Sequence, residues 1–481
     1  MDKKPALILL RRDLRLADNP ALQVAFDTGK PLIILFILDE DEPHTFGGAQ
    51  RWWLHFSLKS LQQDLEKKGG CLILKRGDTR SIVHSYIEEY NCDQVYWNRR
   101  YAGHHVEIDK DLKQKLSEKK VDVFSFNGSL LQEPWAIKTK TDGYYRVFTP
   151  FWRNLQNVAG LGSGVTNPPK SFKTVVADVK TDTIDDWALL PSNPDWAAGF
   201  DEKWSPGEKN AQNALSDFLD GGIGKYKDNR DRPAISGTSR ISPYLAFGEI
   251  SPSLIWQQTM DRIERGLINE DQGNKFLSEL AWRDFAYHLL FHNPEMHTKP
   301  FRPTFESFPW KKDHKTLLAW QKGQTGIPII DAGMRELWQT GWMHNRVRMV
   351  VASFLTKNLL INWQEGERWF WDCLVDADVA SNPVSWQWVA GSGADAAPYF
   401  RIFNAVTQGQ KFDSDGTYVR RYVPELNSLD SKFVHNPWEA PSMLLQDAGI
   451  TLGETYPKPL VDLKLTRQRA LDAYAEIKNA S

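Results

Sequence analysis

The chain has few cysteines, little net charge and no long hydrophobic run. Its 481 residues include three cysteines, Cys71, Cys92 and Cys373, which form neither a disulfide framework nor a metal-binding pair and so favour a reducing compartment. The formal net charge of −2 excludes a protein that coats polyanions through its overall charge, although a local basic groove stays open. No apolar run approaches the roughly 20 residues that cross a bilayer, and the N-terminus lacks a signal-peptide pattern. We therefore expect a cytoplasmic protein.

The first 130 residues alternate between short apolar segments and longer helical ones. Helical periodicity is clearest over residues 51–68, and a second, more charged helix is predicted over 109–120. This alternation predicts a doubly wound parallel α/β sheet. No G-x-G-x-x-G motif follows the first strand, so dinucleotide binding has no support in this half. The predicted strands span residues 7–10, 32–38, 72–74, 95–97 and 121–126.

The remainder of the chain divides into a proline-rich stretch and a helical region. Seven prolines interrupt residues 128–206, where periodicity is weak. Beyond them the apolar pattern is helical, for example over 276–291, 329–338 and 345–360. We predict an α/β domain over 1–130, a connection over 131–204 and an all-helical domain over 205–481.

Tryptophan is abundant where cysteine and methionine are scarce. The chain has 20 tryptophans, and ten of them lie from Trp282 to Trp388. Packing of a helical core is the simplest interpretation. A cluster of indole rings also suits stacking on exposed nucleobases or electron transfer to a redox cofactor. Composition alone leaves these three interpretations open.

Three polar segments interrupt the helical region. Ser242-Pro243 is typical of a helix start, where Ser242 would act as N-cap and nearby hydroxyls could bind phosphate. Glu279 and Arg283 are four residues apart, which is the spacing of an ion pair on one helix face. Buried polar groups need partners, so a third set indicates an internal polar ligand. That set is Asn345, Arg346, Arg348, Asp376, Asp378 and Asn382.

These segments resemble the DNA photolyase and cryptochrome family, and the resemblance covers almost the whole chain. RRDLRLADNPAL is similar to the N-terminal signature of the family. GTSRISPYLAFGEIS, TGIPIIDAGMRELWQTGWMHNRVRMVVASFL and DADVASNPVSWQWVAGSGADAAPYFRIFNAVTQGQKFD are similar to its flavin-domain signatures. The resemblance implies an N-terminal α/β antenna domain and a C-terminal helical FAD domain, in agreement with the division above.

The resemblance also implies roles for individual residues. In this family, fully reduced anionic FAD absorbs blue light and splits a flipped-out cyclobutane pyrimidine dimer by transferring an electron to it. The implied FAD-binding residues are Tyr226, Thr238, Ser239, Arg240, Ile241, Ser242, Arg348, Asp376, Ala377, Asp378 and Asn382, with Arg348 pairing with Asp376 and Asn382 facing flavin N5. The implied DNA and lesion contacts are Arg230, Glu279, Trp282, Arg283, Asn345, Arg346, Met349 and Trp388. The implied electron chain is Trp386, Trp363 and Trp310, and the other clustered rings, Trp320, Trp338, Trp342, Trp369 and Trp371, are assigned to packing.

Several positions distinguish among the activities of the family. Asn382 is typical of photolyases, whereas plant cryptochromes have an acid there and insect ones a cysteine. Asn345 and Met349 stand where (6-4) photolyases have histidines, and DASH-type cryptochromes replace the tryptophans that match Trp282 and Trp388. The pattern favours a cyclobutane pyrimidine dimer photolyase of class III or class I, with GGAQRWWLHFSL favouring class III. The alternative is a cryptochrome-like photoreceptor, against which Asn382, Glu279 and the lack of a long signalling tail after Ser481 argue.

The antenna chromophore is less determined by the resemblance. His104-His105 stands where class I enzymes have an Asn-Glu pair for methenyltetrahydrofolate. We still favour this folate, while a deazaflavin or no antenna stays open. Adjacent histidines also suggest a metal, but an exposed helix start is the commoner explanation and no metal site is predicted. A monomer is the usual state of the family.

Overall fold

The computed structural model describes residues 3–158, 160–162, 164–172, 178–395 and 400–479. The chain divides into two compact units, each assembled from segments distant in sequence. The first unit contains residues 1–224, 239–294 and 375–380, and the second contains 225–238, 295–374 and 381–481. The domain boundaries near residues 130 and 204 stay a prediction.

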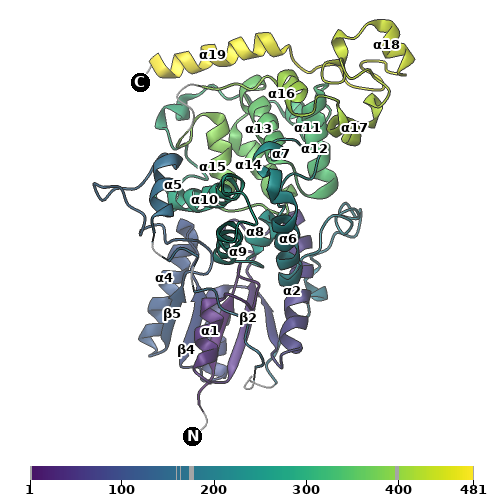
Figure 1. Ribbon diagram of the computed structural model, residues 1–481. Helices are drawn as coiled ribbons and strands as arrows, with labels where there is room; N and C mark the ends of the chain where they lie inside the picture. Colours follow the sequence, from purple (N-terminus) through teal and green to yellow (C-terminus); the bar gives the residue numbers. More distant parts are fainter. Residues whose placement is uncertain (1–2, 159, 163, 173–177, 396–399, 480–481) are drawn as a thin grey trace. The chain divides into compact units, whose positions relative to one another are not determined.

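A five-stranded parallel sheet lies in the N-terminal part of the first unit (Figure 1). Its order is β3-β2-β1-β4-β5, and Ala6 of β1 pairs with Leu32 of β2 and with Gln94 of β4. Every residue of β1 and β2 is buried, as expected for parallel strands covered on both faces. The predicted doubly wound sheet is therefore confirmed. The strands are β1 (Ala6–Leu10), β2 (Leu32–Leu38), β3 (Leu72–Arg76), β4 (Gln94–Asn98) and β5 (Asp122–Phe126).

The helices of the first unit cover this sheet and continue beyond it. The helix predicted over 51–68 spans Gly48–Glu66, with Leu54, Leu58, Leu61 and Leu65 all buried. The helix predicted over 109–120 begins earlier, at Gly103. The prediction missed its first turn, because the residues there lack the charged pattern on which the prediction depended. The helical elements are α1 (Pro20–Asp27), α2 (Gly48–Glu66), α3 (Thr79–Glu89), α4 (Gly103–Glu118), α5 (Phe148–Gln156), η1 (Asp185–Trp187), α6 (Glu208–Asp220), η2 (Gly222–Lys225, whose last residue belongs to the second unit), α8 (Ser242–Phe247), α9 (Pro252–Glu264) and α10 (Glu270–His292).

The second unit is helical in the part that the structure describes, which confirms the predicted helical FAD-domain architecture. The helix predicted over 345–360 is interrupted, because α13 ends at Ser353 and a π-helical turn follows it. The elements are α7 (Tyr226–Asn229), η3 (Pro303–Ser307), α11 (His314–Gln321), α12 (Pro328–Thr340), α13 (Asn345–Ser353), η4 (Phe354–Asn358), α14 (Trp363–Cys373), α15 (Ser381–Ala390), α16 (Ala405–Phe412), α17 (Thr417–Tyr422), η5 (Pro424–Leu426), η6 (Pro437–Glu439), α18 (Ser442–Asp447) and α19 (Leu463–Asn479).

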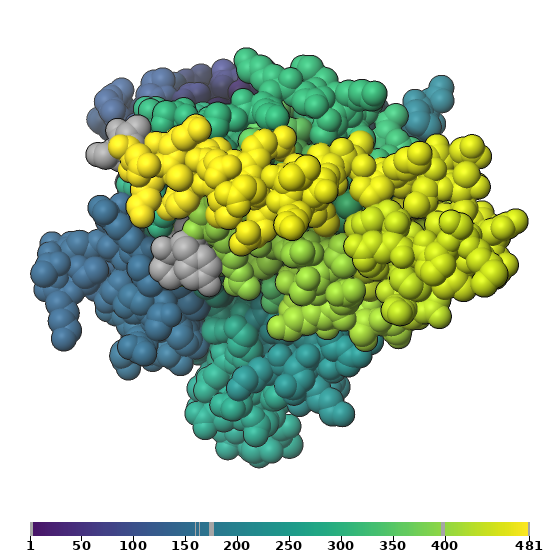
Figure 2. Space-filling view, turned by 90° about the horizontal axis from the view of Figure 1, so that it is seen from above, coloured from purple at the N-terminus to yellow at the C-terminus, as the bar shows by residue number. Residues whose placement is uncertain are grey.

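The C-terminal helix α19 covers one hydrophobic cluster of the second unit. Ala470, Ala473 and Ile477 pack with Phe305 and Phe308 of the segment that leads to Trp310. Figure 2 shows this helix, in yellow, lying along the outer surface of its unit. Among the described residues, no helix combines the length and the hydropathy needed to span a bilayer.

Candidate functional site

Helix α14 brings a glycine against the buried Trp386 of α15. A Cβ atom added to Gly366 would lie 2.1 Å from Cη2 of Trp386, so only glycine permits this approach. Trp386 is 2% exposed, and its ring also meets that of Phe370 edge-on at 4.9 Å. The backbone of α14 therefore forms one wall of the Trp386 site.

The three tryptophans predicted to transfer electrons all lie in the second unit. Trp386 and Trp363 are 2% and 3% exposed, whereas Trp310 is half-buried and its ring lies 4.4 Å from that of Phe308, tilted by 47°. Solvent exposure thus increases from Trp386 through Trp363 to Trp310, which is the order of the predicted electron chain. No ring contact joins any two of the three in the described part of the chain.

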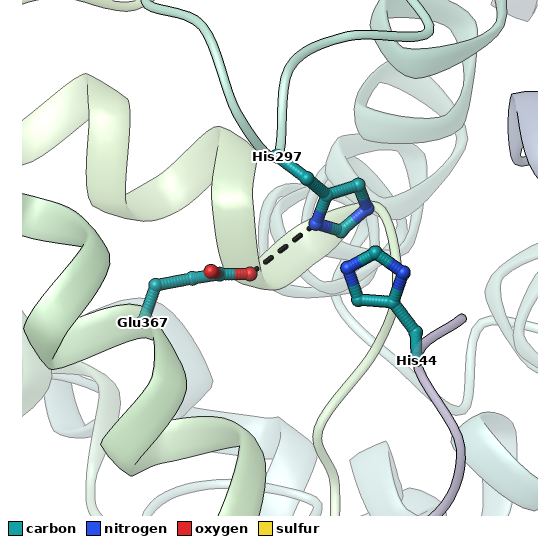
Figure 3. A group of neighbouring side chains, drawn as sticks. All are labelled: His44, His297 and Glu367. Atoms are coloured by element: carbon teal, nitrogen blue, oxygen red, sulfur yellow. Dashed lines mark hydrogen bonds and ion pairs between the residues drawn. The ribbon is translucent and has the colours of Figure 1, made fainter. Parts of the chain in front are cut away.

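Asn382 lies at the start of α15, and its amide faces the same helix α14. Its Nδ2 donates to the backbone oxygen of Glu367 at 3.0 Å and lies 3.5 Å from the Glu367 carboxylate. Figure 3 shows that the same carboxylate also meets His297, whose Nδ1 lies 3.3 Å from Glu367 Oε1. Glu367 was not predicted as a site residue, because its contact with Asn382 joins residues 15 positions apart on two helices.

Helix α13 begins after the buried His344, which acts as its N-cap, and carries polar residues in its first turn. His344 Nδ1 accepts the backbone N–H of Arg346 at 3.1 Å, and burial lowers the pKa of His344 to about 4, so the ring is neutral. His344 Nε2 and Arg346 Nε are buried without a hydrogen-bond partner among the described residues. Buried polar groups need partners. These atoms therefore fit a site that receives a polar ligand.

Asp231 joins the two arginines predicted to contact DNA. Arg346 forms an ion pair with Asp231 at 2.9 Å, and Arg230 Nε lies 4.0 Å from the same carboxylate. Arg230 also lies 5.6 Å from the ring of the buried Tyr226. Asp231 was missed in the sequence, where it is one charge within the run NRDR. Asn345 is exposed and Met349 half-buried on the same helix α13.

Arg348 contacts the backbone of its own unit. Its Nε donates to the carbonyl of Met343 at 2.7 Å, and its guanidinium lies 5.8 Å from the Trp342 ring. Asp376 belongs to the first unit, so the pairing of Arg348 with Asp376 stays a prediction.

The segment Asp376–Asp378 is held by three helices of the first unit. Ser242 Oγ of α8 donates to Asp376 Oδ2 at 2.6 Å, and Gln50 of α2 donates to the carbonyl of Ala377 at 2.6 Å. Tyr287 of α10 donates to Asp378 at 2.7 Å. These contacts fix two of the predicted flavin-binding carboxylates from opposite ends of the segment.

The prediction that Ser242 is an N-cap is wrong. The N-cap is Ile241 and Ser242 is the first helical residue, so its hydroxyl does not cap the helix and donates instead to Asp376. Thr238 lies at the end of a second-unit segment and Ser239 at the start of a first-unit one. Arg240 has a left-handed backbone, with φ of 53°, and its guanidinium lies 4.5 Å from the Trp204 ring.

The predicted ion pair between Glu279 and Arg283 is also wrong. Glu279 pairs with Lys275, one turn earlier, at 2.6 Å. Arg283 turns away and donates to the carbonyl of Ser129, with Tyr287 under its guanidinium at 4.9 Å. Neither Ser129 nor Tyr287 is acidic, so a search for ion pairs at helical spacing does not identify them as partners of Arg283.

Trp282 stacks on a ring outside the predicted site. Its indole lies 3.8 Å from the ring of Phe148 with an interplanar angle of 9°, and Trp282 is half-buried. Phe148 lies in the proline-rich stretch, where periodicity gave no signal. Trp388, in the second unit, is half-buried and donates through Nε1 to the carbonyl of Asp395 at 3.0 Å.

Two tryptophans assigned to packing differ in their surroundings. Trp320 is fully buried and lies 6.2 Å from Trp386. Trp338 is 48% exposed and stacks on Trp369 at 6.0 Å, so it packs at the surface.

Ion pairs cluster in the loops that follow β1, β2 and β4. Arg11 pairs with Asp109 at 2.8 Å, and Arg100 pairs with both Asp109 and Glu42, at 2.7 and 2.6 Å. His105 lies 3.5 Å from Glu42, and burial lowers its pKa well below the usual value. The expectation that His104-His105 forms an exposed helix start is wrong: α4 starts there, but both histidines are half-buried.

Family models match two parts of the chain. Residues 6–170 match the model described as DNA photolyase, and residues 276–476 match the FAD binding domain of DNA photolyase. Together these ranges contain the sheet and most of the candidate residues.

Individual proteins are similar over nearly the whole of this chain. A deoxyribodipyrimidine photo-lyase of Agrobacterium fabrum is 50% identical, with 99% of each chain covered. The crystal structure of a class III photolyase from Agrobacterium tumefaciens has a TM-score of 0.96 at 50% identity, covering 100% of this chain and 98% of the other. Cryptochrome-1 of Arabidopsis thaliana is 36% identical over 98% of this chain and 70% of its own length.

Proposed function

The chain belongs to the DNA photolyase family and is a deoxyribodipyrimidine photo-lyase, and from this premise we propose which of its residues perform light-driven repair. The observation that supports the activity is the full-length 50% identity to a photo-lyase, which far exceeds the identity to the plant cryptochrome. FAD is the catalytic cofactor, in agreement with the matched FAD binding domain. When bound and reduced, FAD supplies the photoexcited electron that splits the cyclobutane dimer.

We propose that the residues predicted from the resemblance hold this flavin. Ser242 orients Asp376 by hydrogen bonding, and Tyr287 orients Asp378, so both carboxylates are fixed before the cofactor binds. Preorganised polar groups cost no rearrangement when the ligand arrives. The other proposed cofactor contacts are Tyr226, Thr238, Ser239, Arg240, Ile241, Arg348, Ala377 and Asn382.

The proposed DNA contacts divide into positioning and lesion-binding groups. Arg230 and Arg346 place positive charge on one side of the second unit, where phosphate contacts would fix the position of the strand. Trp282 and Trp388 are half-buried, which leaves indole surface for stacking on an extruded pyrimidine dimer. Glu279, Arg283, Asn345 and Met349 are the remaining proposed contacts. Glu279 is the residue proposed to stabilise charge on the dimer carbonyls, with Lys275 beside it.

We propose that Trp386, Trp363 and Trp310 reduce the flavin after oxidation. Trp386 and Trp363 are enclosed, while Trp310 reaches solvent, where a positive charge is hydrated at low cost. The tryptophans therefore return the protein to its repair-competent state and do not take part in dimer splitting.

For the antenna we propose methenyltetrahydrofolate. In doubly wound sheets ligands bind at the carboxyl edge, where the strand order reverses, here between β1 and β4. The loops at this edge are tied together by the Arg11, Arg100, Asp109 and Glu42 ion pairs, so the proposal assigns the folate to no residue of this crevice. A near-ultraviolet absorption band of the native protein in addition to that of flavin, and identification of the released pterin, test this proposal. We further propose that the enzyme acts as a monomer in the cytoplasm.

The test of repair uses purified, photoreduced protein and an oligonucleotide with one thymine dimer. Blue light should restore thymine absorbance, and the dark sample should not change. A cryptochrome-like photoreceptor is the alternative, and the absence of restored thymine absorbance under blue light would support it over repair.

A further inference from the structure

The indole of Trp282 is held on one face by a ring of α5. Its centroid lies 3.8 Å from that of Phe148, and the two planes are 9° from parallel. Phe285, three residues further along α10, meets the same indole edge-on at 5.7 Å. Phe148 and Phe285 are 8% and 1% exposed, so both supporting rings are enclosed. One face of Trp282 is therefore occupied, and only the opposite face can stack on a ligand.

The series of parallel rings continues along α5. The ring of Trp152, one turn after Phe148, lies 6.5 Å from that of Phe148, with planes 7° from parallel. Trp152 in turn meets Trp256 of α9 at 5.9 Å and an angle of 64°. Phe148 is thus bordered by a ring on each of two helices, which limits its own rotation.

Helix α10 also fixes the segment that leads to α5. Asp284 accepts the backbone N–H of Leu131 at 2.7 Å. One turn later, His288 Nε2 accepts the backbone N–H of Tyr145 at 3.0 Å, and its Nδ1 lies 3.0 Å from the carbonyl oxygen of Pro134. Burial lowers the pKa of His288 to about 4, so the ring is neutral and its single proton, on Nδ1, is donated to that carbonyl. The helix that carries the stacked indole therefore also fixes the approach of α5 to it.

A fixed plane matters for a ring that stacks on a base, because stacked rings need parallel planes. An indole that is already ordered also loses less side-chain entropy when its ligand binds. We propose that Phe148 is a positioning residue that holds the plane of Trp282 for stacking on the extruded pyrimidine dimer, and so contributes to the discrimination between damaged and undamaged DNA. The inference rests on the proposed function, which assigns Trp282 to the lesion.

The contribution of Phe148 should be confined to damaged DNA. Bases of an undamaged duplex stay paired and stacked, and extruding them costs more than extruding a lesion. Binding of undamaged DNA therefore depends on contacts with phosphates, which carry no information about the lesion. Phe148 has no charge to offer a phosphate, so its loss should leave this binding unchanged.

Removal of the ring tests the inference. Phe148→Leu keeps an apolar side chain but loses the stacked ring. Two duplexes of one sequence, with and without a single thymine dimer, are titrated with the FAD-containing enzyme, and fluorescence anisotropy of a dye excited by red light gives each Kd without starting repair. We expect the Kd for the damaged duplex to rise about three- to ten-fold in Phe148→Leu, while that for the undamaged duplex changes less than about two-fold. Phe148→Tyr retains the ring and should keep most of the wild-type affinity.

A double-mutant cycle shows whether Phe148 acts through Trp282. Trp282→Leu removes the proposed lesion contact, and Phe148→Leu added to it should change the Kd for the damaged duplex by less than about two-fold. A ring that only supports the fold would weaken binding equally in both backgrounds.

Phe151→Leu is the matched control on the same helix. Phe151 is 2% exposed and lies 5.2 Å from the rings of Phe285 and His288, whereas no ring contact joins it to Trp282 within the described residues. Its loss should lower the midpoint of thermal unfolding, Tm, and leave the ratio of the two Kd values unchanged. FAD content and Tm report folding in every sample.

Each outcome decides the matter. An unchanged ratio of the two Kd values in Phe148→Leu overturns the inference, and so does an equal change in Phe151→Leu or an undiminished effect in the Trp282→Leu background. If Phe148→Leu does not fold, Phe148→Met replaces it and is judged by the same ratio. A wild-type protein that does not distinguish the two duplexes, or a Trp282→Leu variant that binds the dimer as the wild type does, would instead contradict the proposed function.

Discussion

Trp386 is surrounded by aromatic rings and by the backbone of α14, so its role in packing must be separated from its role in electron transfer. Trp386→Phe keeps an aromatic ring but raises the cost of its oxidation. We expect rapid photoreduction of oxidised flavin to fall at least about ten-fold, while repair by chemically reduced enzyme stays near the wild-type level. Transient absorption and a dimer-repair assay measure the two effects.

Phe370→Leu provides the matched control for this substitution. Phe370 touches the same face of the site at 4.9 Å, and its loss creates a cavity costing about 1 to 3 kcal/mol without removing an oxidisable ring. Photoreduction should survive in this variant. Equal loss of photoreduction in both variants would assign Trp386 to packing.

Asp284 is a buried residue whose protonation affects stability. Its Oδ1 accepts the backbone N–H groups of Leu131 and Gln132, at 2.7 and 3.1 Å, and burial raises its pKa to about 7. An aspartate in the unfolded chain has a pKa near 4. The folded protein therefore binds the proton more tightly, and stability is lost as pH rises from about 4 to 7, by up to about 1.4 kcal/mol per pH unit.

Asp284→Asn removes this titration while keeping an acceptor oxygen. The Tm difference between the variant and the wild type should move in favour of the variant as pH rises from 4 to 7, and then level off. Thermal melts across this range check the slope. A difference independent of pH would show that Asp284 is ionised throughout.

At the scale of elements, the contact between Asp231, which follows α7, and Arg346 of α13 reduces the positive charge available for binding DNA. Asp231 neutralises part of Arg346 and lies beside Arg230. Asp231→Asn should tighten binding to undamaged duplex about two- to ten-fold and steepen the salt dependence by up to about one counterion. Fluorescence anisotropy at several salt concentrations measures both.

Asp220→Asn is the control, because it breaks an aspartate–arginine pair, with Arg262 at 3.1 Å, on helices of the first unit that contain no predicted DNA contact. Its DNA affinity should match that of the wild type. Tighter binding in both variants would indicate a general effect of net charge, not a role for Asp231.

Elements could be predicted from the sequence where one local period dominates. The leucines at 54, 58, 61 and 65 identify α2, and the apolar run 32–38 identifies β2, because burial on one face or on both leaves a periodic trace. Contacts that join distant segments leave none. The partners of Ser242 and Arg283 are Asp376 and Ser129, so local spacing suggested a cap and an ion pair that tertiary contacts replace.

The candidate site was identified in the sequence through family motifs and not through periodicity. Asn382, Trp386 and Trp388 lie in one such motif. Glu367, His297 and Asp231 were missed, because their importance depends on which side chains they meet after folding.

At the scale of the whole molecule, the cofactor should contribute to stability. A ligand that binds only the folded protein adds about 2.7 kcal/mol when its concentration is 100 times its Kd. Removal of FAD should therefore lower Tm by about 3 °C. Calorimetry of the protein with FAD, without it and after its return checks this expectation.

Riboflavin is the matched ligand, since it lacks the phosphates and adenosine of FAD. It should restore only part of the lost Tm. Full restoration by riboflavin would mean that the phosphate contacts proposed for residues 238–242 contribute little.

Helix α14 limits how this chain can change in evolution. Trp363, Gly366 and Glu367 lie within little more than one turn of this helix, where Gly366 contacts Trp386 and Glu367 accepts a hydrogen bond from Asn382. A single-residue insertion or deletion between them would rotate the following residues by about 100° around the helix axis. Trp386 would then meet a side chain in place of the glycine, and Asn382 would lose its partner. A change in the length of this segment would therefore disrupt the contacts with Trp386 and Asn382 at once.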